Sequence, residues 1–413
     1  MEKIKSFAAL KVTQIRLFIG AVGSFTLAGR ALAVVIAFQI YKITHSPLAL
    51  GWLGLVEAIP AITIAPFGGY IADHFNRKNI LLTTRGTLVL CTLIMAALSW
   101  QTHINPIFGL YIIIFLAGIA RGFADPANTA LEAQIVPKHL TVNASSWIGA
   151  TWITCSVLGP AAIGFIFDGL GAAGSYLIIA AGFAASWIFT LQTQPTAQNI
   201  PHKREAIMGS IATGWRFIFQ HQPLLAAMSL DLFSVFFGGA MILLPVYAND
   251  ILHVGAKGLG LLNAAPSLGA MIMTLLATRH TPIGKAGKNL LLAVTGFGLS
   301  TLVFAFSKNF LLSLAALFFT GVFDGVSMVI RRSMIRLLSP DNLRGRVAAA
   351  NSIFIVASNE LGAFESGMVA ALIGTIPCVA FGGVMTLVIV GFVTAKAKEL
   401  CRLEFNTSTM ERK

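Results

Sequence analysis

Charged residues are scarce in this 413-residue chain, at 11% of the total. A soluble domain carries about 25%, so this chain has too little charge to cover a water-facing surface. The sequence has only four cysteines, which are scattered and exclude a disulfide framework or a CxxC metal site: Cys91, Cys155, Cys378 and Cys401. HExxH, GxSxG and phosphate-loop motifs are absent. The sequence therefore predicts neither a soluble protein nor an enzyme, and we expect no cofactor and no metal.

Apolar residues take the place of charge: AVILMFWYC make up 56% of the chain, and the mean hydropathy is +0.81. They are concentrated in runs of about 20 residues or more, the length that an α-helix needs to cross about 30 Å of hydrocarbon. Strands of about 10 residues with alternating polarity, typical of outer-membrane barrels, are absent. The runs predict an all-α membrane protein with twelve spanning helices, over residues 15–41, 49–72, 79–100, 107–133, 142–168, 173–193, 224–249, 257–279, 288–307, 310–333, 345–373 and 376–395.

The distribution of Lys and Arg predicts how these helices are oriented. Of 29 such residues, 24 fall in the two termini, the central loop and alternate loops, which are predicted to be cytoplasmic. The first run, 15–41, is too long for the core of a signal peptide, so we interpret it as a retained helix. Both termini are therefore predicted to be cytoplasmic. The net charge of +13 is dispersed over seven segments, so we interpret it as a signal of topology, and nucleic-acid binding is not expected.

The two halves of the chain repeat each other. A shift of 203 positions aligns nine identical residues, seven of them Gly or Pro, within about 60 positions, including Gly118 with Gly321 and Pro137 with Pro340. The longest polar stretch lies between the halves and contains a predicted amphipathic helix at 207–219. We therefore predict a six-helix bundle over 1–193, a cytoplasmic linker over 194–223, and a second six-helix bundle with a tail over 224–413. Parallel repeats of this kind are a transporter architecture, with the site near the midplane between the halves.

Both repeats carry a GxxxG motif, Gly118 to Gly122 and Gly321 to Gly325. Such glycines let helix backbones approach closely, and packing is the interpretation we favour for them. The charged residue inside each motif differs, because Arg121 in the first copy is replaced by Asp324 in the second. We hypothesise that these opposite charges face each other across a central cavity.

Charged residues within the predicted spans indicate which helices line a polar path. A charge at membrane depth is costly unless it is paired or hydrated, so it is a functional candidate by default. The helices at 79–100, 173–193, 288–307 and 376–395 carry no charge at depth and are predicted to face lipid. The others carry eight charged residues, which are Arg30, Glu57, Arg121, Asp125, Asp231, Asp324, Glu360 and Glu365.

These eight residues divide into two groups. Asp231, Asp324 and Glu360 have no local partner of opposite charge, and they are the candidates for exchanging a coupling proton as hydration of the cavity changes, with Asp231 and Glu360 preferred and Asp324 third. The rest are candidates for lining the substrate cavity, which are Arg30, Glu57, Arg121, Asp125 and Glu365. Two structural alternatives stay open: Arg121 and Asp125, four residues apart, can neutralise each other, and Glu57 and Glu365 can have purely local roles.

The end of the second predicted helix reads Gly69-Tyr-Ile-Ala-Asp73-His-Phe-Asn-Arg77-Lys78. It resembles the signature loop of the major facilitator superfamily, G-x-L-x-D-R-x-G-R-R/K, at its Gly, Asp, Arg and Lys positions. The resemblance implies that Asp73 and Arg77 belong to a charge network at the cytoplasmic helix ends that favours the outward-facing state. Asn76 stands where the family has its second glycine, and we predict that it adopts the left-handed αL conformation.

Further stretches are similar to the bacterial siderophore and drug exporters of that superfamily, namely Tyr41–Gly51, Leu343–Val347, Leu230–Phe233 and an antiporter-like motif with Gly159, Pro160 and Gly164. The resemblance covers nearly the whole chain. It implies a monomer that exports a small amphipathic molecule across the inner membrane in exchange for protons, with multidrug efflux among the possible activities. Two alternatives stay open: a proton-coupled importer of a small metabolite, and a non-transporting sensor or scaffold.

Overall fold

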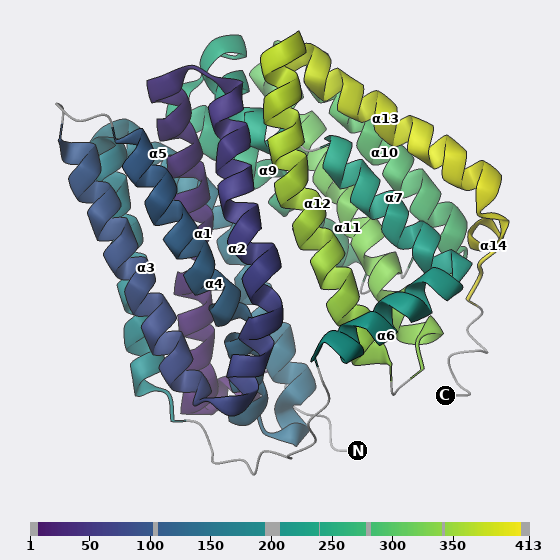
Figure 1. The fold of residues 1–413 in the computed structure, drawn as a ribbon, viewed down its shortest axis with the longest axis horizontal. Coiled ribbons are helices and arrows are strands. Elements are labelled where there is room, and N and C mark those ends of the chain that lie inside the picture. Colours follow the sequence, from purple (N-terminus) through teal and green to yellow (C-terminus); the bar gives the residue numbers. More distant parts are fainter. Residues whose placement is uncertain are drawn as a thin grey trace. The chain divides into compact units, whose positions relative to one another are not determined.

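The computed structural model describes residues 7–101, 106–194, 207–238, 240–277, 282–340 and 343–405, and these are almost entirely helical (Figure 1). The long helices are α1 (Thr13–Thr44), α2 (Pro47–His74), α3 (Arg77–Trp100), α4 (Ile107–Ile135), α5 (Thr141–Gln192), α6 (Ile207–Gln220), α7 (Gln222–Gly238), α9 (Gly255–Ala277), α10 (Ala286–Phe306), α11 (Phe310–Leu338), α12 (Arg344–Ile373) and α13 (Thr375–Lys396). Short turns complete the chain: α8 (Leu244–Val246), α14 (Lys398–Cys401), 3₁₀ turns at Ala9–Lys11, Lys138–Leu140 and Ala240–Leu243, and a π-helical turn at Tyr247–Ile251.

Eleven helical stretches within these described ranges are long and apolar enough to cross a membrane. One of them contains α5, whose 52 residues would measure about 78 Å if straight, more than twice the thickness of the hydrocarbon layer. Gly171 interrupts α5 with a φ of +65°, a conformation that glycine adopts without steric cost. The predicted helices at 142–168 and 173–193 are therefore both present within α5. The predicted all-α fold with twelve spans is confirmed.

The described residues divide into two compact units. The first comprises residues within 1–43 and 56–204, and the second comprises those within 44–55 and 205–413. The boundaries that we predicted at 193 and 224 stay a prediction. The expected amphipathic helix at 207–219 is present as α6.

Glycines bring helices into close contact at corresponding places in the two units. In the first unit, a Cβ on Gly118 would lie 2.6 Å from Pro60 Cγ, so α4 packs directly on α2. In the second unit, a Cβ on Gly321 would overlap the backbone carbonyl of Pro266, so α11 packs in the same way on α9. The predicted packing role of both GxxxG motifs is confirmed. The repeated glycine–proline contact is what a duplicated sequence would produce.

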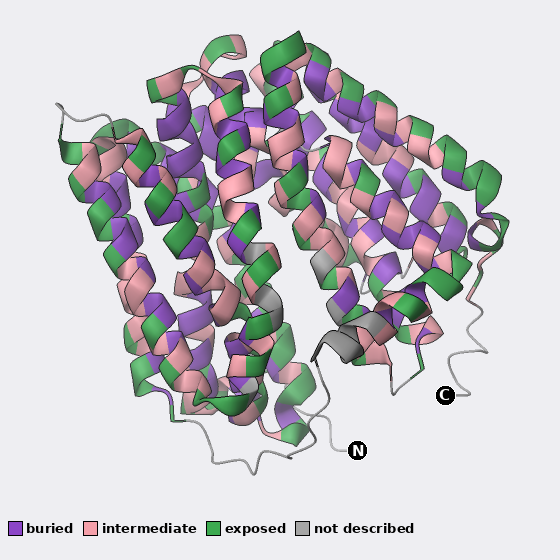
Figure 2. Cartoon of the chain, viewed as in Figure 1, coloured by how far each residue is buried: buried purple, intermediate pink, exposed green. Residues whose placement is uncertain are grey.

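Large apolar side chains are exposed along one face of the helices that we predicted to face lipid. On α10 this face carries Leu292, Leu299, Val303 and Phe306, which are 47% to 68% exposed. Figure 2 shows exposed residues recurring along α3 and α13 as well. Exposed apolar side chains in this arrangement are suited to contact with the hydrocarbon of a membrane. That the third helix carries no charge at membrane depth stays a prediction, although Arg85 of α3 is buried within the protein, as described below.

Candidate functional site

Three charged side chains meet inside the second unit. Arg331 of α11 forms an ion pair with Asp231 of α7 through Nη1 and Oδ2. The second guanidinium nitrogen, Nη2, lies 3.8 Å from Oδ1 of Asp324, and Nε donates a hydrogen bond of 3.2 Å to Ser327 Oγ. The Arg331 and Asp231 side chains are 8% and 10% exposed, whereas that of Asp324 is 46% exposed. One arginine is thus shared by two carboxylates.

Helix periodicity explains why these groups meet. Asp324, Ser327 and Arg331 are three and four residues apart along α11, so they lie on one face of that helix. Leu230 of α7 and Ile330 of α11, the neighbours of Asp231 and Arg331 in sequence, are buried in one apolar cluster. This packing brings the two helices together and removes their charged side chains from solvent. A buried charge is tolerated when it is paired, and the Asp231–Arg331 contact meets this condition.

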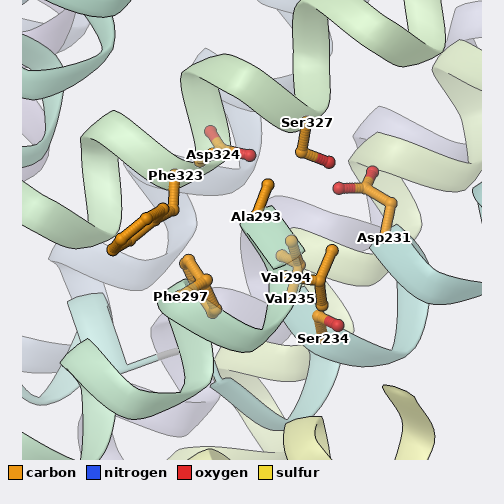
Figure 3. A pocket seen from close by; sticks show the side chains of 9 residues that line it. All are labelled: Asp231, Ser234, Val235, Ala293, Val294, Phe297, Phe323, Asp324 and Ser327. Carbon is orange, nitrogen blue, oxygen red and sulfur yellow. The ribbon is translucent and has the colours of Figure 1, made fainter. Parts of the chain in front are cut away.

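A small cavity borders this cluster (Figure 3). It is lined by Asp231, Ser234 and Val235 of α7, by Ala293, Val294 and Phe297 of α10, and by Phe323, Asp324 and Ser327 of α11. Figure 3 shows the two phenylalanines on one side and Asp231 and Ser327 on the other. The space open to the centre of a water molecule is about 10 Å³, which is the room that one water needs. Ser234 Oγ is buried and has no hydrogen-bond partner within the described chain, so it is available to such a water.

The structure corrects our prediction that Asp231 and Asp324 have no partner of opposite charge. Arg331 lies near the end of the predicted helix at 310–333, and we had counted it with the cytoplasmic basic residues that follow. In the structure α11 continues to Leu338, and Arg331 is buried. The spacing in the sequence could have indicated this pairing, because Arg331 follows Asp324 by two helical turns and lies on the same face of the helix.

The first unit holds a different ion pair. Arg121 Nη2 of α4 lies 3.3 Å from Glu57 Oε1 of α2, with side chains that are 33% and 22% exposed. Asp125 is exposed one turn further along α4. In the part of the chain that the structure describes, Arg121 therefore pairs with Glu57 of another helix, and the alternative pairing with Asp125 is not formed.

Arg30 of α1 lies over an aromatic ring. Its guanidinium carbon is 5.6 Å from the ring centroid of Trp152 on α5, a cation–π contact. Both side chains are exposed. Close by, a Cβ on Gly159 would lie 2.7 Å from the carbonyl oxygen of Leu27. The glycine of the antiporter-like motif thus allows α5 to approach α1 closely, next to Arg30.

The acids of α12 lie outside the cavity lining. Glu360 and Glu365 are both partly exposed, and Glu365 Oε2 accepts a hydrogen bond of 3.4 Å from Ser366 Oγ. The lining of the cavity thus includes Asp231 and Asp324 but not Glu360. Among the described residues, no group of three or more His, Cys, Asp or Glu side chains is placed to hold a metal ion.

The signature loop connects α2 to α3. Asn76 accepts hydrogen bonds from the backbone N–H groups of Lys78 and Asn79, and its backbone is extended, with φ −64° and ψ 112°. Our prediction that Asn76 adopts αL is therefore wrong, because an N-cap residue needs extended backbone. Arg77 Nε donates to the carbonyl of Ala72 at 2.9 Å. Lys78 Nζ donates to the carbonyl of Leu191 at 2.7 Å, at the end of α5.

Two other members of the signature loop, Asp73 and Gly69, add no support for the predicted charge network at the cytoplasmic helix ends. The side chain of Asp73 lies outside the part of the chain that is described. A Cβ on Gly69 would have open space around it, so close packing does not require glycine there. The proposed charge network of Asp73 and Arg77 therefore stays a prediction.

Replacing Asn76 with alanine should destabilise the start of α3. The substitution removes the oxygen that accepts from two backbone N–H groups, and such a loss costs about 0.5–2 kcal/mol. Unfolding of the purified protein in mixed micelles would measure the change. Asn76→Ser, which keeps a capping oxygen, is the control and should restore most of the stability. If the alanine and serine variants are equally destabilised, the cap is not the cause.

Arg85 is a functional candidate that sequence reasoning missed. This α3 side chain is only 2% exposed. It donates to the carbonyl of Ser186 at 3.3 Å and to Asn128 Oδ1 at 3.1 Å, and its guanidinium carbon lies 5.5 Å from the centroid of the Phe25 ring. We had counted Arg85 among the cytoplasmic residues. Its contacts show that it joins α1, α3, α4 and α5 within the first unit.

This fold, with two repeated helical units and paired charges within its spans, defines a multi-pass membrane protein of transporter architecture. The family model described as Major Facilitator Superfamily matches residues 17–288. The chain belongs to the major facilitator superfamily and is therefore a membrane transporter by family.

Known proteins similar to this chain agree with that assignment. Enterobactin exporter EntS of Shigella boydii serotype 18 is 26% identical over 364 residues, which cover 87% of this chain and 85% of that protein. Enterobactin exporter EntS of Citrobacter koseri is 26% identical over 369 residues, which cover 88% of this chain and 86% of that protein.

Solved structures show the same fold. A POT family transporter aligns with a TM-score of 0.74 at 10% identity, covering 94% of this chain and 96% of that one. A bacterial homologue of the human lysosomal transporter Spinster aligns with a TM-score of 0.71 at 14% identity, covering 95% and 97%. At these identities the likeness concerns the fold alone.

Proposed function

We propose that this chain exports a small amphipathic molecule across the bacterial inner membrane by proton antiport. The observation that carries the proposal is the shared arginine, because Asp231, Asp324 and Arg331 lie together within spanning helices beside a cavity of about one water. Carboxylates at membrane depth are typical of proton pathways in transporters. The similarity to enterobactin exporters over most of the chain supports the direction of transport.

A catecholate siderophore is the substrate class that we favour. Such a molecule combines aromatic rings with acidic oxygens. Arg30 and Trp152 present a cation and an exposed aromatic ring side by side, which suits that combination. Arg121, Glu57 and Asp125 are the other polar groups proposed for the substrate path of the first unit, and Glu365 is the one proposed in the second. A drug-like amphipathic compound has the same features and is the alternative within this class.

Transport would proceed by alternating access. A proton binding to the carboxylates of the second unit changes their charge and thereby the relative stability of the inward-open and outward-open states. Asp73, Arg77 and Lys78, with Gly69, are proposed to stabilise one of these states at the cytoplasmic ends of the helices. Glu360 stays a proposed secondary proton site.

Efflux from cells tests this function directly. Cells that lack their own exporters would express this chain and be loaded in turn with enterobactin, a hydroxamate siderophore, a lipophilic cationic dye and a neutral antibiotic. We expect loss of enterobactin that stops when a protonophore is added. Asp324→Asn should abolish proton-driven efflux, whereas Glu132→Gln, at a partly exposed position of α4 outside the cavity lining, should leave it unchanged.

Other outcomes would select among the alternatives. Loss of the dye or the antibiotic alone would indicate a drug exporter. Uptake of any compound in place of loss would overturn the export proposal in favour of an importer. If no compound moves in either direction although the protein is present in the membrane, the proposal fails for these four classes and a sensor or scaffold becomes the working hypothesis.

A further inference from the structure

We propose that Asp324 is the group that binds the coupling proton, and that Asp231 and Arg331 form a fixed ion pair that positions a positive charge beside it. The inference rests on the proposed proton antiport and gives each of the three residues a separate role. It reverses the order that the sequence favoured, in which Asp231 came before Asp324.

The first argument is access to protons. Asp324 and Asp231 both line the cavity, but the Asp324 side chain is 46% exposed and that of Asp231 is 10% exposed. A group that exchanges protons in each transport cycle must be reached by water. The Asp324 side chain is the more exposed of the two, and Asp231 is in direct contact with its arginine partner.

The second argument is contact with the arginine. Asp231 Oδ2 is in direct contact with Arg331 Nη1, while Asp324 Oδ1 is 3.8 Å from Nη2. Protonating Asp231 would leave the Arg331 charge without its closest partner, inside the protein, which is a large penalty. Protonating Asp324 keeps that pair intact. The geometry therefore favours a proton on Asp324.

The third argument is the charge of the cluster. The two carboxylates and the Arg331 guanidinium sum to −1, since Arg332 is exposed and outside the cavity lining, and one bound proton brings the sum to zero. The neutral cluster is the less costly one to enclose when water leaves the cavity. In the chemical step, a hydronium ion on the accessible side gives its proton to a carboxylate oxygen of Asp324 and becomes water. The reverse transfer, from the Asp324 hydroxyl to water, occurs on the other side of the membrane.

The remaining charged groups on the packed helices do not supply another carboxylate to the cavity. α11 packs against α7, α9, α10 and α12. In their described residues, α7 adds no charge besides Asp231, and the others carry Lys257 on α9, Lys288 on α10, and Arg344, Arg346, Glu360 and Glu365 on α12. On α11 itself, Arg332 acts electrostatically on Asp324, and Arg336 is one turn beyond. None of these side chains is part of the cavity lining.

Ser234 provides an independent indication that water reaches the cluster. Its hydroxyl is buried at the cavity and has no hydrogen-bond partner within the described residues. A buried hydroxyl of this kind is normally satisfied by protein or by an ordered water. One water in the cavity would satisfy it and also provide Asp324 with a partner for proton transfer. Ser327 already accepts a hydrogen bond from Arg331 and helps to fix that side chain.

Infrared difference spectroscopy tests the assignment without any substrate. The purified full chain in lipid nanodiscs would be compared in mildly acidic and mildly alkaline buffer, and the stretch of protonated carboxyl groups would be measured. Relative to the wild type, Asp324→Asn should lose the intensity of one carboxyl group. The double variant Asp231→Asn/Arg331→Met removes the ion pair as a unit and should retain that intensity.

Each other result contradicts the inference. If only the double variant loses the carboxyl intensity, the proton is on Asp231. If Asp324→Asn and the double variant both lose it, proton binding needs the intact ion pair. If neither variant loses it, the cluster does not titrate. Asp324→Glu guards against misfolding, because it should restore the lost intensity, and each variant must elute as the wild type does. Since no substrate is used, failure of the efflux experiment alone would overturn the proposed function, whereas the spectra would still decide which residue of the cluster binds a proton.

Discussion

Replacing Arg331 with methionine should destabilise the second unit by about 3–5 kcal/mol, the penalty for leaving a buried charge unpaired. Asp231 would remain enclosed between α7 and α11 without the guanidinium that it contacts. The free energy of unfolding, measured by titration with denaturing detergent in mixed micelles, would report this loss. We expect one of the largest effects of any single substitution in the chain at this position.

Two further variants separate the ion pair from other effects of the substitution. Arg336→Met removes an exposed arginine from the same helix and should change the free energy of unfolding by about 0.5 kcal/mol or less. Asp231→Asn/Arg331→Met removes both charges and should recover much of the stability, because no unpaired charge is left. If Arg331→Met and Arg336→Met have the same free energy of unfolding, the ion pair does not stabilise the protein.

Replacing Gly321 with alanine should disrupt the contact between α11 and α9. The added Cβ would overlap the backbone carbonyl of Pro266, and a backbone atom cannot move aside as a flexible side chain can. Forcing extra atoms into a packed interface typically costs about 1–3 kcal/mol. The same mixed-micelle unfolding experiment would measure the cost. Because Asp324 and Arg331 are on α11, we also expect weaker transport.

Gly391 of α13 offers the matched control. A Cβ at Gly391 would have no other group within 4 Å, so alanine fits there without strain. The intrinsic helix preference of alanine over glycine, about 1 kcal/mol, should make Gly391→Ala neutral or stabilising. Equal destabilisation by Gly321→Ala and Gly391→Ala would show that the close approach of α11 and α9 is not required for stability.

Sequence reasoning found both members of the Glu57–Arg121 ion pair but only the acids of the other charged cluster. Asp231, Asp324, Glu57 and Arg121 were recognisable because a charge within an apolar run is rare. Arg331 was not, because it follows the apolar core of its helix, where an arginine also fits a cytoplasmic loop. Arg85 was missed because it precedes the apolar core of its helix, and the structure places it among the most deeply buried side chains.

The signature loop shows the same limit on a smaller scale. The motif positions of Gly69, Arg77 and Lys78 are visible in the sequence, and the family is correctly identified from them. The conformation of Asn76 was not correctly predicted from the sequence, because asparagine can either adopt αL or cap a helix. Only the backbone N–H groups of Lys78 and Asn79, which point at its side chain, decided between the two.

The sequence by itself determined the fold class, the twelve spans, the internal repeat and the family. It could do so because a bilayer requires apolar helices of sufficient length with all their backbone hydrogen bonds formed internally, a requirement that each segment meets alone. Tertiary structure alone decided the pairings, Asp231 with Arg331 and Glu57 with Arg121. These join side chains from different helices, and their distance depends on how closely the helices pack, which no single segment specifies.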